Sequence, residues 1–199
     1  MRDHGGMLLP ETDYDGDVFT DSLAGVSAAG SRFLDCTFQR CDLSEFKAPR
    51  ARFAETSLYA VHGAGLDLAE SSWSDALVQG VRLGAVAMYG ADVSRVRFEG
   101  CKIEFLNLRG ATLRDVQFVD CQLVEADFAE ATLRQVSFEG SRLVSPDFSR
   151  GAFTDVDLTG ADLAGPRGVA GLRGATVSRL QLMDLGQALA DELGIVVTD

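Results

Sequence analysis

Residues 111–130 read ATLRD VQFVD CQLVE ADFAE, and residues 131–150 read ATLRQ VSFEG SRLVS PDFSR. The two stretches agree in residue character at almost every position, so a unit of twenty residues is repeated. Within each stretch an apolar residue returns at every fifth position, as Leu113, Phe118 and Leu123 do. A period of five matches neither an α-helix nor a β-strand. It requires a chain that turns regularly after each short segment.

The five-residue register extends over most of the chain. Every fifth residue from Leu23 to Leu163 is apolar, with Gly63 as the one exception. The position two residues before each of these is mostly small or β-branched, and the other three positions are mainly polar. Four such five-residue sides make one square coil, and coils stack about 4.8 Å apart, the distance between hydrogen-bonded strands. Residues 31–150 then form uninterrupted coils, with a degenerate first coil over residues 11–30 and most of a further coil over residues 151–165.

Single units of the repeat resemble a known family. ADFAE (126–130), ADLAG (161–165) and CDLSE (41–45) are similar to the pentapeptide-repeat motif A(D/N)LXX. The resemblance covers about residues 18–165 and implies an all-β solenoid, a right-handed quadrilateral parallel β-helix. We therefore expect an N-terminal acidic segment (1–17), the β-helix (18–165) and a C-terminal segment for capping or dimerisation (166–199).

The C-terminal segment changes its pattern. Residues 178–194 read SRLQLMDLGQALADELG, which predicts an α-helix that begins with a capping box from Ser178 and Gln181. Residues 195–197 predict a short strand. The segment covers the open end of the solenoid or joins two copies across a two-fold axis, and a dimer would also cap the end. The predicted dimer interface consists of Leu182, Leu185, Leu189, Leu193 and Ile195.

Composition and motifs exclude several classes of function. The net charge of −12 argues against direct binding to nucleic acid, because phosphates would repel the chain. No apolar run approaches the roughly 18 residues of a membrane span, and we expect no signal peptide, hence a cytoplasmic protein. The four cysteines lack CxxC spacing, so neither a metal site nor a disulfide framework is expected. The sequence contains no recognisable pair of nucleophile and general base and no phosphate-binding loop. Catalysis needs such groups to converge in one pocket, so we expect a protein that is not an enzyme and holds no cofactor.

A few positions depart from the repeat. Gly63 marks a bulge or contact point, or else Trp73 fills the space that it leaves. Tyr59, Tyr89 and Phe105 point outward and either anchor a partner or are ordinary scattered aromatics. The cysteines fall in the small inward column, where they act as small buried hydrophobes or, for a stacked pair, as redox partners; they are Cys36, Cys41, Cys101 and Cys121.

One outward column is mostly acidic. It runs Asp35, Glu55, Asp75, Arg95, Asp115, Gln135 and Asp155. Carboxylates about 5 Å apart repel by roughly 0.8 kcal/mol in water, so a surface selected only for stability would avoid them. We expect this column to bind a partner by imitating the charge of DNA. In the alternative, the acids pair with neighbouring arginines and form a nearly neutral surface; those arginines are Arg32, Arg52, Arg114 and Arg134.

The family resemblance points to a partner. The ending LADELGIVVTD (189–199) resembles the C-termini of the albicidin-resistance and other gyrase-directed members, which are end-to-end dimers. The resemblance implies a homodimer that binds DNA gyrase, and either inhibits it or protects it from gyrase poisons such as fluoroquinolones and albicidin. The plasmid-borne quinolone-resistance members carry projecting loops that this chain lacks, so both outcomes stay open. The alternative is a protein-interaction scaffold unrelated to topoisomerases.

Overall fold

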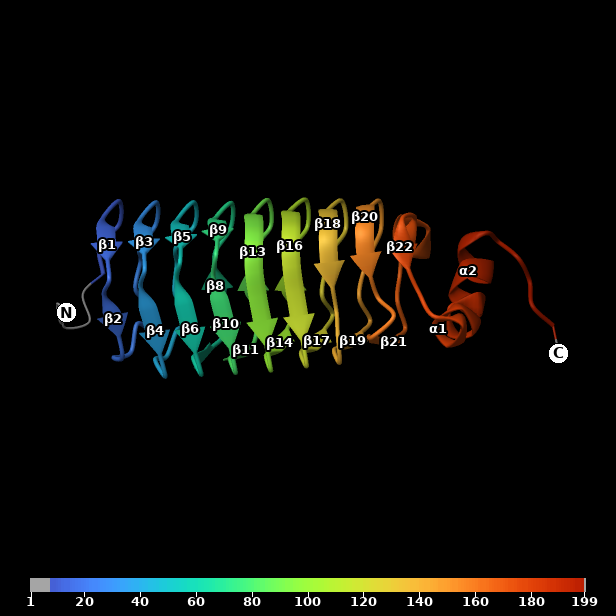
Figure 1. Cartoon of the computed structure of the whole chain (residues 1–199), viewed down its shortest axis with the longest axis horizontal. Coiled ribbons are helices and arrows are strands. Elements are labelled where there is room, and N and C mark those ends of the chain that lie inside the picture. Colours follow the sequence, from blue (N-terminus) through green and yellow to red (C-terminus); the bar gives the residue numbers. More distant parts are fainter. Residues whose placement is uncertain (1–7, 199) are drawn as a thin grey trace.

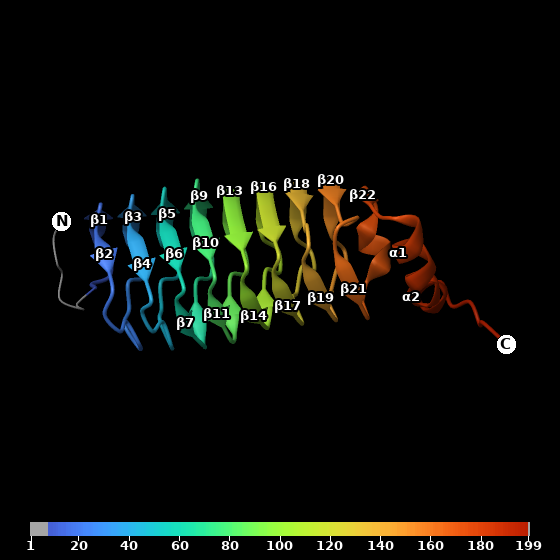
Figure 2. The same cartoon turned by 60° about the horizontal axis from the view of Figure 1, so that its bottom comes forward.

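The chain winds into a row of stacked coils. The structure is a computed structural model that describes residues 8–198. Figures 1 and 2 show the coils following one another in sequence order, with the helices beyond the last coil at the C-terminal end. Strands of successive coils pair in parallel with a shift of twenty residues, as Leu113 pairs with Leu133. The predicted right-handed quadrilateral β-helix is confirmed.

The strands fall on four sides, which we number in chain order. Side 1 carries β1 (Asp13–Asp15), β3 (Arg32–Leu34), β5 (Arg52–Ala54) and β9 (Ser72–Ser74). Side 2 carries β2 (Val18–Phe19), β4 (Thr37–Gln39), β6 (Ser57–Tyr59) and β10 (Leu77–Gln79). In later coils one strand runs over both sides: β13 (Asp92–Glu99), β16 (Thr112–Val119), β18 (Thr132–Ser137) and β20 (Ala152–Asp157).

The other two sides hold shorter strands. Side 3 carries β7 (His62–Gly63), β11 (Arg82–Leu83), β14 (Lys102–Glu104), β17 (Gln122–Val124), β19 (Arg142–Val144) and β21 (Asp162–Ala164). Side 4 carries β8 (Leu66–Asp67), β12 (Val86–Ala87) and β15 (Leu106–Asn107), and isolated bridges continue it. The repeat therefore generates four flat outer surfaces.

The first coil is shorter by one residue, which is missing after Phe19. Tyr14 pairs with Phe33 and Phe19 with Phe38, a shift of nineteen, whereas Ser27 on side 4 pairs with Lys47, a shift of twenty. The expected degenerate coil is therefore present. The N-terminal acidic segment of residues 1–17 lies partly outside the described residues, and its last part contains β1, paired with β3.

Almost every corner of the coil is a residue in the left-handed conformation. Non-glycine corners have φ values from 50°, as at Asp35, to 60°, as at Glu130. Glycine adopts this conformation freely, aspartate tolerates it better than most residues, and a bulky side chain there is uncommon. Corner composition is thus set partly by the backbone.

The centre of the coil is filled by stacked side chains. Phe118 is completely buried and stacks on Phe98 at 4.8 Å and on Phe138 at 4.9 Å between ring centroids. On side 1, Phe53 stacks on Phe33 at 4.9 Å. Offset or stacked aromatic pairs at these distances add to the free energy of burial. The five-residue register thus becomes continuous ladders of rings along the axis.

The small inward column also forms hydrogen bonds. The Thr56 hydroxyl lies 3.1 Å from the carbonyl oxygens of Phe33 and Ala54, so it bridges two coils. The Cys101 thiol donates in the same way to Val78 and Glu99, at 3.2 and 3.4 Å. All four cysteines are buried and free. Their reading as small buried side chains is confirmed.

Gly63 is required by a close approach of two coils. A Cβ at Gly63 would lie 2.6 Å from the backbone nitrogen of Ser44, and the residue has φ 152°. Trp73 instead stacks on Phe53 on side 1, with 4.0 Å between centroids. An apolar cavity of about 30 Å³ remains between Trp73, Leu43 and Leu83, among other side chains. The close contact with the backbone of Ser44 on the preceding coil therefore explains the glycine, and the alternative that Trp73 fills the space beside Gly63 does not.

The C-terminal segment differs from the predicted single helix. After a 3₁₀ helix (Val169–Leu172) and β22 (Ala175–Thr176), two short helices follow: α1 (Arg179–Asp184) and α2 (Gly186–Glu192). Residues 195–198 form no strand, so that prediction was wrong and β22 is the short strand of this segment. The capping box is present, because the N–H of Gln181 donates to Ser178 Oγ at 3.2 Å and the N–H of Ser178 donates to Gln181 Oε1 at 2.7 Å.

The same glutamine fastens the helices to the solenoid. Gln181 Nε2 donates to the carbonyls of Leu158 and Ala161, at 2.5 and 2.7 Å. Leu185 lies between α1 and α2 and is 4% exposed. The helices therefore cap the last coil, as the sequence predicts. The described residues hold no helix with the length and apolar character that a membrane crossing requires.

Candidate functional site

The acidic column lies along the corner between sides 1 and 2. Its members Asp35, Glu55, Asp75, Asp115 and Asp155 all have φ between 50° and 56°. Parallel pairing of Leu34 with Ala54 and of Ala54 with Ser74 places consecutive members on consecutive coils. The left-handed backbone favours aspartate here. Part of the column's composition therefore has a structural cause.

One member of the column is neutralised from within it. Arg95 Nε and Nη2 lie 2.6 and 2.8 Å from the two carboxylate oxygens of Asp75. This two-point contact holds the pKa of Asp75 below its ordinary value. The column is therefore interrupted at its middle coil by an internal ion pair.

The arginines expected to neutralise the other acids do not do so. Arg32 pairs with Asp13 in the first coil, with 3.4 Å between Nε and Oδ1. Within residues 8–198, Arg52, Arg114 and Arg134 make no ion pair. In the same part of the chain, four column acids form no ion pair, although Asp115 is attracted by the neighbouring Arg95; the four are Asp35, Glu55, Asp115 and Asp155. Their charge is available to a partner.

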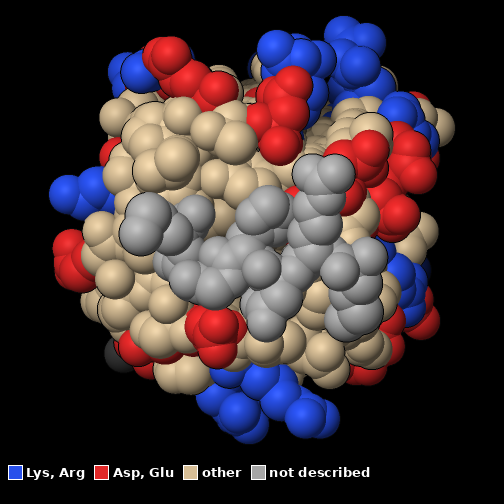
Figure 3. All heavy atoms as spheres, turned by 90° about the vertical axis from the view of Figure 1, so that its left-hand side faces the viewer, with Lys and Arg blue, Asp and Glu red and all other residues tan. Residues whose placement is uncertain are grey.

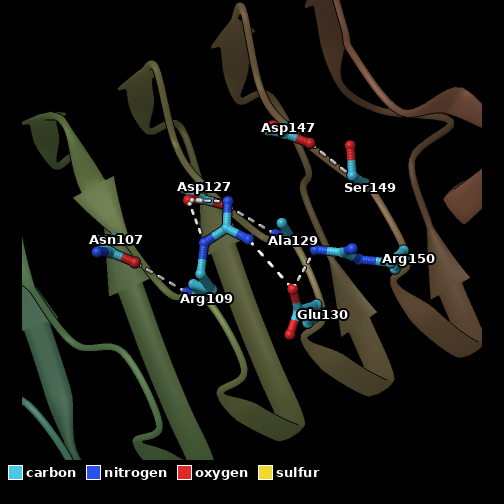
Figure 4. A network of polar contacts seen from close by, with 8 residues as sticks. All are labelled: Asn107, Arg109, Asp127, Ala129, Glu130, Asp147, Ser149 and Arg150. Atoms are coloured by element: carbon cyan, nitrogen blue, oxygen red, sulfur yellow. Dashed lines mark hydrogen bonds and ion pairs between the residues drawn. The ribbon is translucent and has the colours of Figure 1, made fainter.

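On side 4 the acids are used by the protein itself (Figure 4). The side-chain oxygens of Asn107, Asp127 and Asp147 accept the N–H of the residue two positions later, at 3.0, 2.8 and 2.8 Å. Arg109 contacts Asp127 at 3.0 Å, and contacts Glu130 at 3.3 Å. These acids support the turns between coils.

Glu130 extends this network to the next coil. Its carboxylate also pairs with Arg150, so one acid bridges two arginines on different coils. For Asp147, burial acts to raise the pKa, but the hydrogen bonds from Ser149 outweigh it and the pKa is lowered. Sequence reasoning missed this network. The aspartate of units such as ADFAE (126–130) was the available signal, since it is the residue that accepts the turn hydrogen bond.

Charge of both signs surrounds the rod. Viewed from the N-terminal end, cationic and anionic side chains alternate around the visible rim (Figure 3). The net charge of −12 is therefore not gathered on one side of the molecule seen in this view. An acidic contact would be a narrow column rather than a broad surface.

The predicted dimer residues do not share one face. Leu185 is buried against the last coil and Leu189 is half-buried, whereas Leu182 is 53% exposed, Leu193 73% and Ile195 56%. The single-face prediction was wrong because the helix is broken between α1 and α2. Further exposed apolar side chains at this end were missed: Leu180, Met183, Val196 and Val197. This end nevertheless presents a large apolar surface.

Two of the four thiols are unsuited to nucleophilic chemistry. Burial raises the pKa of Cys36 and of Cys41 to about 11, so each stays protonated at neutral pH. Within residues 8–198, no cluster of three or more His, Cys, Asp or Glu side chains is placed to hold a metal ion.

Comparisons with known proteins agree with the repeat. The family model described as "Pentapeptide repeat region" matches residues 31–108 and 91–167. A search of curated protein sequences finds no match to this chain. A trypsin-treated form of QnrB1, a plasmid-mediated fluoroquinolone resistance protein, superposes with a TM-score of 0.59 at 17% identity, covering 98% of this chain and 95% of that one.

A second solved structure is more distant. HetL, a pentapeptide repeat protein involved in heterocyst differentiation regulation in the cyanobacterium Nostoc sp. strain PCC 7120, matches with a TM-score of 0.32 at 16% identity. That match covers 83% of this chain and 86% of HetL. At these identities the structural matches concern the fold alone.

Proposed function

Because the chain belongs to the pentapeptide-repeat family, we propose that it is a dimeric, DNA-mimicking protein that binds DNA gyrase. It would inhibit the enzyme or protect it from poisons such as fluoroquinolones and albicidin. Its role is binding rather than catalysis, and a gyrase-directed protein acts in the cytoplasm. The observation that carries the proposal is the column of corner carboxylates that form no ion pair.

The column suits a groove that normally holds DNA. Its carboxylates recur with each coil, about every 4.8 Å along the rod, and duplex DNA carries one phosphate charge per roughly 1.7 Å of its axis. The column is therefore sparser than DNA but has the same sign and a straight course. A basic protein groove would gain from Asp35, Glu55, Asp115 and Asp155, which form no ion pair within the described residues.

A dimer would double the length of this surface. Leu182, Leu193 and Ile195 are exposed at the C-terminal end of the rod, beyond the last coil (Figure 1). Association across a two-fold axis at that end would cover them and align two rods end to end.

The test is a supercoiling assay with purified gyrase, with and without a quinolone or albicidin. We expect inhibition or drug protection at micromolar dimer, weakened in Asp35→Lys/Asp115→Lys. The matched control is Glu45→Lys/Glu125→Lys, which makes the same charge change at left-handed corners on the opposite edge of the coil. No effect of the unmodified protein, or equal loss in both double variants, would reject the proposal.

A scaffold unrelated to topoisomerases is the second candidate. The mixture of both charge signs around the rod favours it, because such a surface suits several contacts rather than one polyanion mimic. A protein that leaves gyrase unaffected at micromolar concentration, yet keeps its fold, would favour this candidate.

A further inference from the structure

Side 3 carries two stacked cations without an ion pair, preceded in the same column by a histidine and by Asp42. His62, Arg82 and Lys102 occupy the same position in three successive coils, since Arg82 pairs with both neighbours in register. All three are exposed. Within residues 8–198, Arg82 and Lys102 make no ion pair, whereas Arg142, in the same column, contacts Asp162 at 3.4 Å.

Several other cations are neutralised, whereas Arg82 and Lys102, like Arg52, Arg114 and Arg134, make no ion pair within residues 8–198. Arg95, Arg109 and Arg150 each contact a carboxylate on an adjacent coil. Arg82 instead has a histidine on one side and a lysine on the other. Stacked like charges destabilise a surface unless a partner offsets them. Although the net charge of the chain is −12, no carboxylate forms an ion pair with Arg82 or Lys102 within residues 8–198.

Small side chains adjoin these residues at the corner between sides 3 and 4. A Cβ at Gly84 would lie 2.7 Å from the Cβ of Ala64, so the Ala64 methyl group lies directly against Gly84. Phe105 stands at the same corner one coil later, and Tyr89 lies on side 4. These two residues are 51% and 45% exposed. Ala85 and Ala87 continue the surface of small side chains, whereas the carboxylate of Glu45 lies against Gly65.

Phe105 is an unusual corner residue. It has φ 51°, and it is the one aromatic residue with positive φ among the described residues. A bulky side chain in this conformation is strained, and such strain persists where the side chain has a use. An exposed ring beside a flat surface of glycine and alanine can pack against an apolar group of a partner.

We propose that His62, Arg82, Lys102 and Phe105, with the alanines of the corner beside them, dock an acidic segment of a partner protein that carries an aromatic or aliphatic side chain. Carboxylates of the segment pair with Arg82 and Lys102, and its apolar side chain packs on Phe105. Arginine offers two donors to a carboxylate, which fixes the orientation of the segment. This surface is distinct from the acidic column and does not depend on gyrase binding.

The surrounding charges favour a short acidic segment over nucleic acid. Glu104 lies two residues after Lys102, and Glu45 and Glu125 occupy the same corner column as Phe105. A phosphate backbone that continued past the cations would meet these carboxylates. A segment with few carboxylates can instead end between them.

The probe is a fluorescein-labelled peptide with one Glu-Glu-Phe unit between Gly-Ser flanks, measured by fluorescence anisotropy with the full-length protein at low salt. We expect submillimolar binding that Arg82→Glu/Lys102→Glu weakens about tenfold or more. Phe105→Ala should weaken it, and a Glu-Glu-Ser peptide should bind less tightly. The matched control is Arg32→Glu/Arg142→Glu, which makes the same charge change at arginines that already have carboxylate partners.

Several results would overturn the proposal. They are absence of peptide binding at millimolar protein, equal weakening by the two double variants, and equal binding of the Glu-Glu-Ser peptide. Binding of a labelled 20-base-pair DNA duplex in place of the peptide would assign the cations to nucleic acid. Circular dichroism of each variant shows whether the coils are retained, and the gyrase assay is read separately because it tests the other surface.

Discussion

Removal of one ring from the central ladder should destabilise the whole rod. In Phe118→Ala, a completely buried side chain is lost together with its stacking on Phe98 and Phe138. Burial and cavity effects of a Phe→Ala change cost about 3–5 kcal/mol, and each aromatic pair adds roughly 0.5–1.5 kcal/mol. We therefore expect a loss near the upper end, about 5 kcal/mol. With an m value of about 2.5 kcal/mol/M, the urea midpoint falls by about 2 M.

The measurement is urea unfolding followed by circular dichroism. The control is Phe105→Ala, which removes the same group from a half-exposed corner and should shift the midpoint little. A loss below about 1 kcal/mol in Phe118→Ala, or the same loss in both variants, would refute the reasoning from stacked coils. Each coil contacts only the coils next to it. The urea unfolding transition of Phe118→Ala should therefore also broaden, because the two halves of the rod unfold less cooperatively.

Three other changes test separate parts of the structure. Gly63→Ala places a Cβ against the backbone of the coil below and should lower the melting temperature by several degrees in differential scanning calorimetry, and an unchanged value would contradict the close approach. Leu185→Asp should unfold the cap, whereas Leu193→Asp should keep the fold and give a monomer by light scattering; a dimer with Leu193→Asp would argue against the C-terminal interface. Arg95→Ala should raise the pKa of Asp75 toward its ordinary value in a carbon-13 NMR titration. Because the pKa of Asp75 is lowered in the folded state, the ion pair stabilises the fold at pH values above the unfolded pKa of the carboxyl group. This stabilisation is lost as the pH falls through the folded pKa. If the pKa of Asp75 does not change in Arg95→Ala, the contact is ruled out.

The repeat could be predicted from the sequence because its signal is local and cumulative. Centres such as Phe118 and Leu123 recur at a spacing that only a regularly turning chain can bury. Gly63 was located as the exception, but its cause is a backbone contact with Ser44, nineteen residues earlier on the preceding coil. A distance between coils cannot be read from the spacing of apolar residues.

The surfaces were less predictable than the core. The acidic column lies at an outward corner, as the sequence predicts. The arginine that pairs with it was not predicted, because the bidentate contact of Arg95 with Asp75 depends on side-chain conformations. The C-terminal leucines were assigned to one face since a continuous helix was assumed, and the break before Gly186 places Leu185 inside and Leu193 outside. Leu185 shows that an amphipathic pattern does not distinguish a cap from a dimer interface.

The central claim is that the rod occupies a DNA-binding surface of gyrase. The most direct measurement is biolayer interferometry of immobilised protein with purified gyrase, with increasing concentrations of a linear DNA duplex as competitor. We predict micromolar or tighter binding that the duplex displaces and that Asp35→Lys/Asp115→Lys weakens. Binding that the duplex leaves unchanged, or no binding at micromolar gyrase, would contradict the claim.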